Sequence, residues 1–186
     1  MGLKIAFTGP ESSGKTTLSE WVSQTYNMDL VEEYAREYLK DCGPYTQIDL
    51  DNIAQEQFNR NAASNKATIL DTEMLVMRIW CEEKFGACSD VIESLFVQQN
   101  IDIYFLCKPD FKWHPDPLRE SPNERERLFD LYFFYLEKME VRFHILEGDL
   151  LQRKNTISDI MKTYWYEKSD IYFRAFDGLC PNRILL

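Results

Sequence analysis

The sequence has few basic residues, few histidines and no long apolar run. Its 186 residues include 21 Lys and Arg against 31 Asp and Glu, a net charge of -10, which argues against a nucleic-acid surface because phosphate backbones bind basic faces. The 2 histidines are far apart and the 5 cysteines contain no CxxC pair, so neither a zinc site nor a disulfide framework is expected. No apolar run reaches transmembrane length. These absences predict a cytoplasmic protein with reduced thiols and with no nucleic-acid or membrane partner.

One dense phosphate-binding motif lies near the beginning of the chain. Residues 9–16, GPESSGKT, match the P-loop spacing of Gly, four residues and Gly-Lys-Ser/Thr. The Lys15 ammonium is expected to reach the β- and γ-phosphates, and the Thr16 hydroxyl to hold Mg²⁺. A predicted strand at 3–8 and a helix that begins near residue 14 supply the context that the motif requires, so a chance Gly/Ser turn is the weaker interpretation. The residues predicted to bind the nucleotide here are Gly9, Glu11, Ser12, Ser13, Gly14, Lys15, Thr16 and Thr17.

Short apolar runs alternate with amphipathic stretches along the rest of the chain. Further strands are predicted at 28–31, 67–71, 102–107 and 143–147. Helices are predicted at 48–65, 73–85, 90–98, 123–140 and 149–164. In the helix at 48–65, the residues expected to face inward are Ile48, Ile53, Phe58 and Ala62. This alternation predicts an α/β P-loop fold, with a five-stranded parallel sheet covered by helices on both faces, in a single domain over residues 1–186.

Acidic side chains follow two of the predicted strands, at the sheet edge where open α/β proteins bind ligands. The segment 32–37 is rich in acids, which either face a ligand or begin a solvated helix. It also contains Tyr34 and Arg36, which the solvated alternative does not explain. Asp71 ends the strand at 67–71, and an acid there holds Mg²⁺ in P-loop proteins, directly or through water. We favour that role over capping of the next helix. Thr16 and Asp71 are therefore the predicted metal ligands.

A proline-rich segment at 109–123 is predicted to form a lid, since prolines restrain a loop without pairing it into a sheet. Arg119 lies inside this segment, and its guanidinium would neutralise charge that develops on the transferring phosphoryl group. Arg125 and Arg127 follow it and either extend the lid or pair with neighbouring glutamates on the next helix. The aromatic stretch 165–186 would suit packing on the core, pairing with a second copy in a homo-oligomer, or covering the site.

These features together indicate a small P-loop kinase. The sequence has no NKxD guanine motif and no good switch-like DxxG, which makes a GTPase less well supported. Phosphoryl transfer to a hydroxyl needs a base for the acceptor proton, and Glu33 and Asp71 are the candidates. The residues predicted to be catalytic are therefore Lys15, Glu33, Asp71 and Arg119. Trp80, on the apolar stripe of the helix at 73–85, either joins the core or lines a substrate pocket.

The order of these blocks resembles the ribosylnicotinamide kinase domain of the bacterial NAD-biosynthesis regulator family, within the P-loop NTPase superfamily. The resemblance covers roughly residues 3–150 and rests on four blocks. They are GPESSGKT at 9–16, EYARE at 33–37, DTE at 71–73 and the segment 113–119 with Arg127. It implies Mg²⁺- and ATP-dependent phosphorylation of nicotinamide riboside at its 5′-hydroxyl, which gives nicotinamide mononucleotide.

Carried over by position, the resemblance implies that the lid arginines Arg119 and Arg127 contact the nucleotide. The residues that it places at the nucleoside, the metal or the lid are Glu33, Tyr34, Arg36, Asp71, Glu73, Trp113 and Asp116, to which we add Trp80 as an aromatic candidate. The chain departs from the family in two ways. It lacks the HxGH motif of an adenylyltransferase, and it has Glu73 where an aspartate is common. Two alternatives are another nucleoside or nucleotide kinase and a non-catalytic module that senses ATP or NAD.

Overall fold

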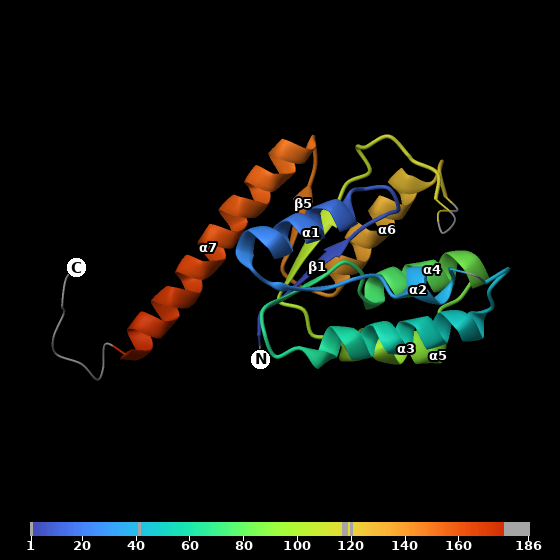
Figure 1. The fold of residues 1–186 in the computed structure, drawn as a ribbon, viewed down its shortest axis with the longest axis horizontal. Helices are drawn as coiled ribbons and strands as arrows, with labels where there is room; N and C mark the ends of the chain where they lie inside the picture. Colours follow the sequence, from blue (N-terminus) through green and yellow to red (C-terminus); the bar gives the residue numbers. More distant parts are fainter. Residues whose placement is uncertain (1, 41, 117–118, 120, 177–186) are drawn as a thin grey trace. The chain divides into compact units, whose positions relative to one another are not determined.

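The computed structural model describes residues 2–40, 42–116, 119 and 121–176, with side chains up to residue 164. Five strands form one sheet: β1 Lys4–Thr8, β2 Asp29–Val31, β3 Thr68–Leu70, β4 Ile103–Cys107 and β5 Phe143–Leu146. The helices within the described residues are α1 Lys15–Tyr26, α2 Ala35–Tyr38, α3 Gln47–Ala63, α4 Met74–Phe85, α5 Asp90–Gln98, α6 Arg125–Lys138 and α7 Leu150–Phe176 (Figure 1). Within the described residues, none of the helices has the length and apolarity that a bilayer span requires.

All five strands of the sheet are parallel, in the order β2-β3-β1-β4-β5. The crossover from β1 to β2 and the crossover from β3 to β4 run in opposite directions across the sheet. Since such crossovers are right-handed, helices of the two directions cover opposite faces. Accordingly, α1 contacts β1, β2 and β3, whereas α4 and α6 share a buried cluster with the strand residues Ala6, Leu70, Tyr104 and Leu106. The predicted α/β P-loop fold is therefore confirmed.

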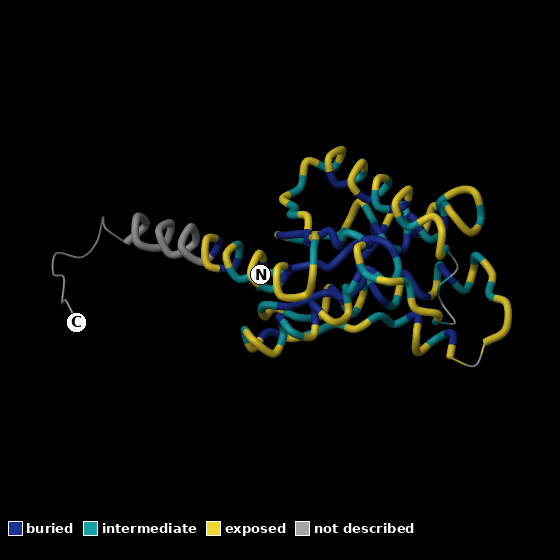
Figure 2. Tube along the Cα trace, turned by 90° about the horizontal axis from the view of Figure 1, so that it is seen from above, coloured by how far each residue is buried: buried dark blue, intermediate teal, exposed yellow. Residues whose placement is uncertain are grey.

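Burial follows this layering. In Figure 2, the buried stretches run through the middle of residues 2–147, and the exposed ones lie on its outer helices and loops. Every residue of β4 is buried, as expected for a central strand of a parallel sheet. A second apolar cluster joins α2, α3, α4 and α5, and it includes Leu50, Ile53 and Met77. In the chain, α2 and α3 follow β2, and α4 and α5 follow β3, so this layer packs together the segments that leave those two strands.

The buried face of α3 differs from the predicted one. Ile48 is 71% exposed and Ala62 is exposed, so the prediction that they face inward was wrong. The buried positions of the helix are Leu50, Ile53, Ala54, Gln57 and Asn61. These positions follow the three- and four-residue spacing of one helical face. Ile48, Ile53 and Phe58 are spaced five residues apart, so they cannot all lie on that face. Two of the buried positions are amides, which an apolar stripe could not identify.

The described residues form two compact units, one that ends at Glu147 and one that begins at Gly148. The second unit contains α7, which extends past the predicted end at residue 164 to Phe176. Its first turn is closed by reciprocal bonds, in which the backbone N–H groups of Asp149 and Gln152 donate to each other's side chains (2.8 and 2.9 Å). The last part of the predicted tail, residues 177–186, lies outside the described residues. Single-domain organisation stays a prediction.

Candidate active site

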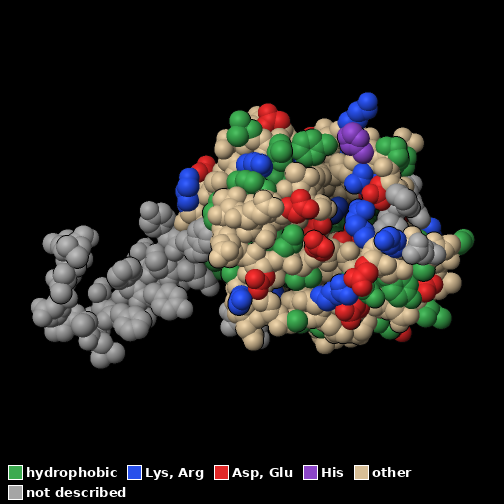
Figure 3. Space-filling view, viewed as in Figure 1, with side chains coloured by type: hydrophobic (Ala, Val, Ile, Leu, Met, Phe, Trp, Pro, Cys, Tyr) green, Lys and Arg blue, Asp and Glu red, His purple; other side chains and the backbone are tan. Residues whose placement is uncertain are grey.

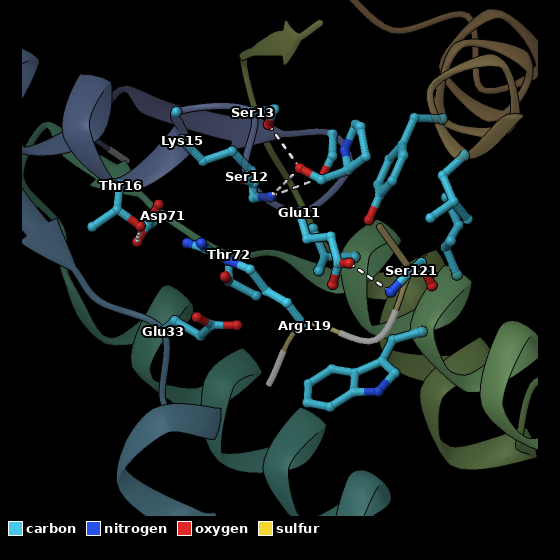
Figure 4. A pocket seen from close by; sticks show the side chains of 18 of the residues that line it. Glu11, Ser12, Ser13, Lys15, Thr16, Glu33, Asp71, Thr72, Arg119 and Ser121 are labelled. Atoms are coloured by element: carbon cyan, nitrogen blue, oxygen red, sulfur yellow. Dashed lines mark hydrogen bonds between the residues drawn. The ribbon is translucent and has the colours of Figure 1, made fainter. Parts of the chain in front are cut away.

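A cavity opens at the carboxyl ends of β1, β2 and β3, where three sequence motifs meet. The P-loop follows β1, Glu33 follows β2 and Asp71 follows β3, and all three line the cavity. The other residues outside the P-loop that line it are Thr17, Arg36, Thr72, Val76, Ile79, Trp80, Glu83, Arg119, Ser121, Leu128 and Tyr132. Figure 3 shows basic and acidic side chains together around a hollow on this face, and Figure 4 shows the labelled ones in close-up. Parallel strands end at one edge, which explains why residues so far apart in sequence converge here.

The backbone of the P-loop turns through left-handed conformations. Gly9 has φ 124°, Ser12 has φ 56° and Gly14 has φ 89°, immediately before α1 begins at Lys15. A Cβ atom on Gly9 would lie 2.7 Å from the carbonyl oxygen of Cys107, so a larger residue cannot fit there without moving the backbone of β4. The turned loop at the start of a helix is the geometry of an anion-binding cradle.

Lys15 lies folded over the loop that it follows. Its Nζ donates to the carbonyl oxygens of Gly9 (2.8 Å) and Pro10 (2.9 Å). Burial lowers the pKa of Lys15, while the nearby carboxylates of Asp71 and Glu33 oppose that shift. The ammonium is thus held at the cavity by two carbonyl groups and favoured in its charged form by two acids. This arrangement fits a lysine that meets a polyphosphate.

Thr16 and Asp71 form a hydrogen-bonded pair at the same end of the cavity. Thr16 Oγ1 donates to Asp71 Oδ2 at 2.8 Å, and the other oxygen, Oδ1, is buried with no hydrogen-bond partner among the described residues. Burial raises the pKa of Asp71, and the Thr16 hydroxyl and Lys15 oppose the shift. A buried acceptor of this kind fits a divalent cation or a water bound to one. No group of three His, Cys, Asp or Glu side chains gathers as a metal site within the described residues. Since Mg²⁺ commonly keeps several waters, one carboxylate and one hydroxyl suffice.

Glu33 faces the cavity from the segment after β2 (Figure 4). Its carboxylate accepts an ion-paired bond from Arg36 Nε at 2.8 Å, and its side chain is 19% exposed. Burial raises the pKa of Glu33, and the positive charges of Arg36 and Lys15 oppose that shift. Arg36 also donates from Nη1 to Asp116 Oδ2 at 3.0 Å, so one guanidinium joins the predicted base to the proline-rich segment. Asp116 does not line the cavity itself, but it bonds Arg36, which does.

The proline-rich segment is bonded to the P-loop at several points. Glu11 Oε1 accepts from the backbone N–H of Ser121 (2.6 Å) and from Trp113 Nε1 (3.4 Å). Ser12 Oγ accepts from the backbone N–H of His114 at 3.2 Å. The Glu11 carboxylate, predicted to bind the nucleotide, thus also bonds the lid. These bonds hold the described part of the segment beside the phosphate cradle.

Two arginines were predicted to act from the lid, and one of them reaches the cavity. Arg119 lines it and donates from Nη1 to the carbonyl oxygen of His114 at 2.7 Å. Arg127 does not line it, because it pairs with Glu83 and with Glu124 (2.8 Å) on the exposed side of α6. Those pairs raise the pKa of Arg127 further above its ordinary value. The geometry therefore favours the solvated-helix interpretation for Arg127. Arg125, by contrast, donates to the carbonyl oxygen of Phe111 at 2.9 Å.

Three other predicted contacts are not part of the cavity wall. Glu73 is fully buried and caps α4, since its carboxylate accepts from the backbone N–H of Leu75 (2.6 Å) and from Thr8 Oγ1 (2.8 Å). Glu73, rather than Asp71, is therefore the helix cap, and the structure does not support Glu73 as a substrate contact. Tyr34 lies against Arg60, whose guanidinium carbon is 4.1 Å from the ring centroid. Trp113 bonds Glu11 instead of lining the cavity.

Sequence reasoning missed part of the apolar wall. Leu128 and Tyr132 lie one turn apart on α6 and line the cavity together with Val76 and Ile79 of α4. Both pairs follow the helical spacing of ordinary core residues, so the pattern could not separate pocket from core. Trp80, left open between those two roles, lines the cavity. Its Nε1 donates to the Tyr45 hydroxyl at 2.7 Å, which fixes the plane of the indole.

Comparison with known proteins identifies a family and several relatives. The sequence profile of the family described as "AAA domain" matches residues 4–153. The trifunctional NAD biosynthesis/regulator protein NadR of Salmonella typhimurium is 25% identical over 157 residues, which cover 78% of this chain and 38% of that protein. The protein of the same name from Escherichia coli is 26% identical over 156 residues, with the same two coverages of 78% and 38%. The chain thus spans 38% of the length of these curated relatives.

Two solved structures share the fold. A crystal structure of NadR in complex with NR has a TM-score of 0.70 at 20% identity, and the match covers 100% of this chain and 54% of that one. Deoxyadenosine kinase from M. mycoides, with products dCMP and a flexible dCDP bound, has a TM-score of 0.65 at 14% identity, covering 87% of this chain and 100% of that one. The predicted resemblance to the NAD-biosynthesis regulator family is confirmed.

Proposed function

The chain belongs to the AAA domain family, and from this premise we propose that it is an ATP-dependent kinase that phosphorylates nicotinamide riboside on its 5′-hydroxyl. The observation that carries the proposal is the convergence of Lys15, the Thr16–Asp71 pair and Glu33 on one cavity. Those groups supply the functions that phosphoryl transfer needs: a positive charge for phosphate, ligands for Mg²⁺ and a proton acceptor. The product would be nicotinamide mononucleotide.

The nucleotide end of the cavity is the P-loop. Its backbone N–H groups and Lys15 would bind the phosphates of ATP, and the Thr16 hydroxyl and Asp71 would hold Mg²⁺. When bound, the metal neutralises charge on the phosphoryl group that is transferred. Arg119 reaches the cavity from the lid segment, and its guanidinium would help to neutralise the same charge. ATP and Mg²⁺ are therefore the cofactors that we propose.

The acceptor end is assigned to Glu33. Asp71 already accepts a bond from Thr16 and lies at the metal end, whereas the Glu33 carboxylate faces the cavity from the segment that follows the neighbouring strand β2. Burial raises the pKa of Glu33, which makes it a better proton acceptor than an exposed glutamate. Its bond to Arg36 fixes the orientation of the carboxylate. We therefore propose that Glu33 accepts the proton of the 5′-hydroxyl.

The aromatic wall suits the charge of the proposed substrate. Nicotinamide riboside carries a positive ring, and positive groups bind favourably over aromatic faces. Trp80 and Tyr132 both line the cavity, and their aromatic faces carry this argument, because the Glu83 carboxylate on the same wall is already paired with Arg127. The names of the relatives, one of them solved with NR, support the same substrate class. A cytoplasmic location is part of the proposal, supported by free thiols at the four described cysteines.

The test of this function is ADP release by the purified chain with Mg²⁺-ATP and a panel of acceptors. The panel contains nicotinamide riboside, thymidine, deoxyadenosine, deoxycytidine and no acceptor. We expect strong stimulation of ADP release by nicotinamide riboside. In the Lys15→Ala variant the rate should fall by about 10³-fold, because Lys15 supplies the positive charge at the phosphates. Stimulation by a deoxynucleoside in its place would contradict the proposed substrate.

A deoxynucleoside kinase is the second candidate, because the deoxyadenosine kinase of M. mycoides is matched over its whole chain with a TM-score of 0.65. The same panel separates the two. If ATP binds and no acceptor stimulates ADP release, the alternative of a module that senses ATP or NAD takes the place of both. Sedimentation of the same sample would show whether the chain forms a homo-oligomer, which is one of the three roles left open for the aromatic stretch 165–186.

A further inference from the structure

We propose that two buried amides on α3, Gln57 and Asn61, are positioning residues that hold the two acid-bearing segments of the site at a fixed separation. Neither side chain lines the cavity. Gln57 is fully buried and Asn61 is 8% exposed, so both amides lie away from water. The inference rests on the proposed function in one respect, namely that Glu33 and Asp71 act on the substrate and the metal.

Gln57 bonds the backbone on both sides of Glu33. Its Oε1 accepts from the backbone N–H of Tyr34 at 2.7 Å. Its Nε2 donates to the carbonyl oxygen of Glu32 at 3.2 Å. The two peptide groups that flank the proposed base are thereby fixed to one side chain of α3. Such a bracket sets the direction in which the Glu33 side chain leaves the backbone.

Asn61 extends the same connection to the second acid. Its Oδ1 accepts from Gln57 Nε2 at 3.0 Å, and its Nδ2 donates to the carbonyl oxygen of Thr72 at 3.1 Å. Thr72 directly follows Asp71 and lines the cavity itself. A continuous series of hydrogen bonds therefore runs from the segment of Glu33 through two amides to the segment of Asp71.

The amides take over where the sheet stops. β2 and β3 are paired up to Val31 and Leu70, and the last bond between the strands is from the backbone N–H of Asp71 to the carbonyl oxygen of Val31 at 3.0 Å. Beyond that bond, Glu33 and Thr72 belong to separate loops. Outside the sheet, the backbone N–H of Tyr34 and the carbonyl groups of Glu32 and Thr72 need partners other than the β ladder. Gln57 and Asn61 supply those bonds at the two positions where the site needs them.

A purely structural role does not account for the choice of residues. The rest of the inner face of α3 is apolar, with Leu50, Ile53 and Ala54. Burying an amide there costs free energy unless each of its polar atoms is bonded. Apart from the bond between the amides, the bonds observed for them go to the two acid-bearing segments. Polar networks of this kind fix one geometry more than they add stability.

The test compares these amides with a matched pair on the same helix. Gln55 and Asn59 form the same side-chain bond four residues apart, at 3.2 Å, but both are exposed. We expect Gln57→Met and Asn61→Leu to lower kcat for nicotinamide riboside by about 10- to 100-fold, with KM for ATP changed less than about twofold. The control variants Gln55→Met and Asn59→Leu should keep the wild-type kcat. If kcat is equal in both pairs, or if KM for ATP rises as much as kcat falls, the inference is overturned.

A conservative variant distinguishes positioning from loss of folding. Gln57→Glu keeps an acceptor for the N–H of Tyr34 and removes the donors to Glu32 and to Asn61, so it retains one of the three bonds that Gln57→Met loses. Its kcat should therefore lie between those of wild type and Gln57→Met. All variants are compared below their unfolding temperatures. A kcat of Gln57→Glu no higher than that of Gln57→Met would contradict the proposed bracket.

Amide hydrogen exchange provides a readout that needs no substrate. The backbone N–H of Tyr34 bonds to a side chain, so its protection should fall in Gln57→Met and stay unchanged in Gln55→Met. If the wild-type chain phosphorylates no acceptor, the proposed function fails while this measurement still decides whether the amide holds the segment. Unchanged protection of Tyr34 in Gln57→Met would overturn the inference whatever the substrate is.

Discussion

Replacing Glu33 by glutamine is expected to lower kcat for nicotinamide riboside by about 10²- to 10⁴-fold, the range that a positioned base contributes. Glutamine keeps the size of the side chain and removes the charged oxygen that would accept the proton of the 5′-hydroxyl. KM for ATP should change little, because the P-loop and Lys15 are untouched. Glu32→Gln is the matched control, since Glu32 precedes Glu33 in the same segment and its side chain is exposed.

The pH dependence of the same variant gives the more specific result. Burial raises the pKa of Glu33 above its ordinary value of 4.5. A base acts in its deprotonated form, so wild-type kcat/KM should fall as the pH is lowered through that raised pKa. Glu33→Gln should lack this acidic limb. If the limb persists in Glu33→Gln and disappears in Asp71→Asn, the proton acceptor is Asp71 and our assignment is wrong.

Replacing Asp71 by asparagine should raise the Mg²⁺ concentration needed for half-maximal activity by about 10- to 100-fold. Asparagine keeps an oxygen for the bond from Thr16 but loses the negative charge, while the buried Oδ1 is the atom that fits the metal or its water. A Mg²⁺ titration of ADP release measures the effect. Thr16→Ser, which keeps the donating hydroxyl, is the control expected to stay near wild type.

Stability separates this prediction from a general loss of structure. Burial raises the pKa of Asp71, which means that the ionised carboxylate costs the folded state free energy at neutral pH. Asp71→Asn should therefore unfold at the same temperature as wild type or at a higher one. An unchanged Mg²⁺ requirement, or a lower unfolding temperature that accounts for the lost activity, would contradict the metal role.

The fold and the phosphate end of the site could be predicted because their residues are adjacent in sequence. The P-loop fixes residue types at set distances, and the strand before it and the helix after it follow from local patterns. Asp71 could be placed because a buried parallel strand is a continuous apolar run, and its last residue must lie at the sheet edge. The proline-rich segment was found by composition, and its Arg119 reaches the cavity.

The rest of the site depends on packing that local patterns do not encode. Glu73 and Asp71 are two residues apart after the same strand, yet Glu73 turns inward to cap α4 while Asp71 lines the cavity. Gln57 and Gln55 are equally two apart on α3, and only their angle around the helix makes the first buried and the second exposed. Choosing between such pairs requires knowing which face of each helix meets the sheet.

The most direct test of the central claim is to identify the phosphorylated product after incubation of the chain with Mg²⁺-ATP and nicotinamide riboside. Phosphorus NMR with coupling to the 5′ carbon, together with ADP quantification, gives both the product and the stoichiometry. Our account predicts nicotinamide mononucleotide, phosphorylated on the 5′ oxygen, in an amount equal to the ADP formed. ADP formed without a phosphorylated riboside, or a phosphate on a different hydroxyl, would contradict it.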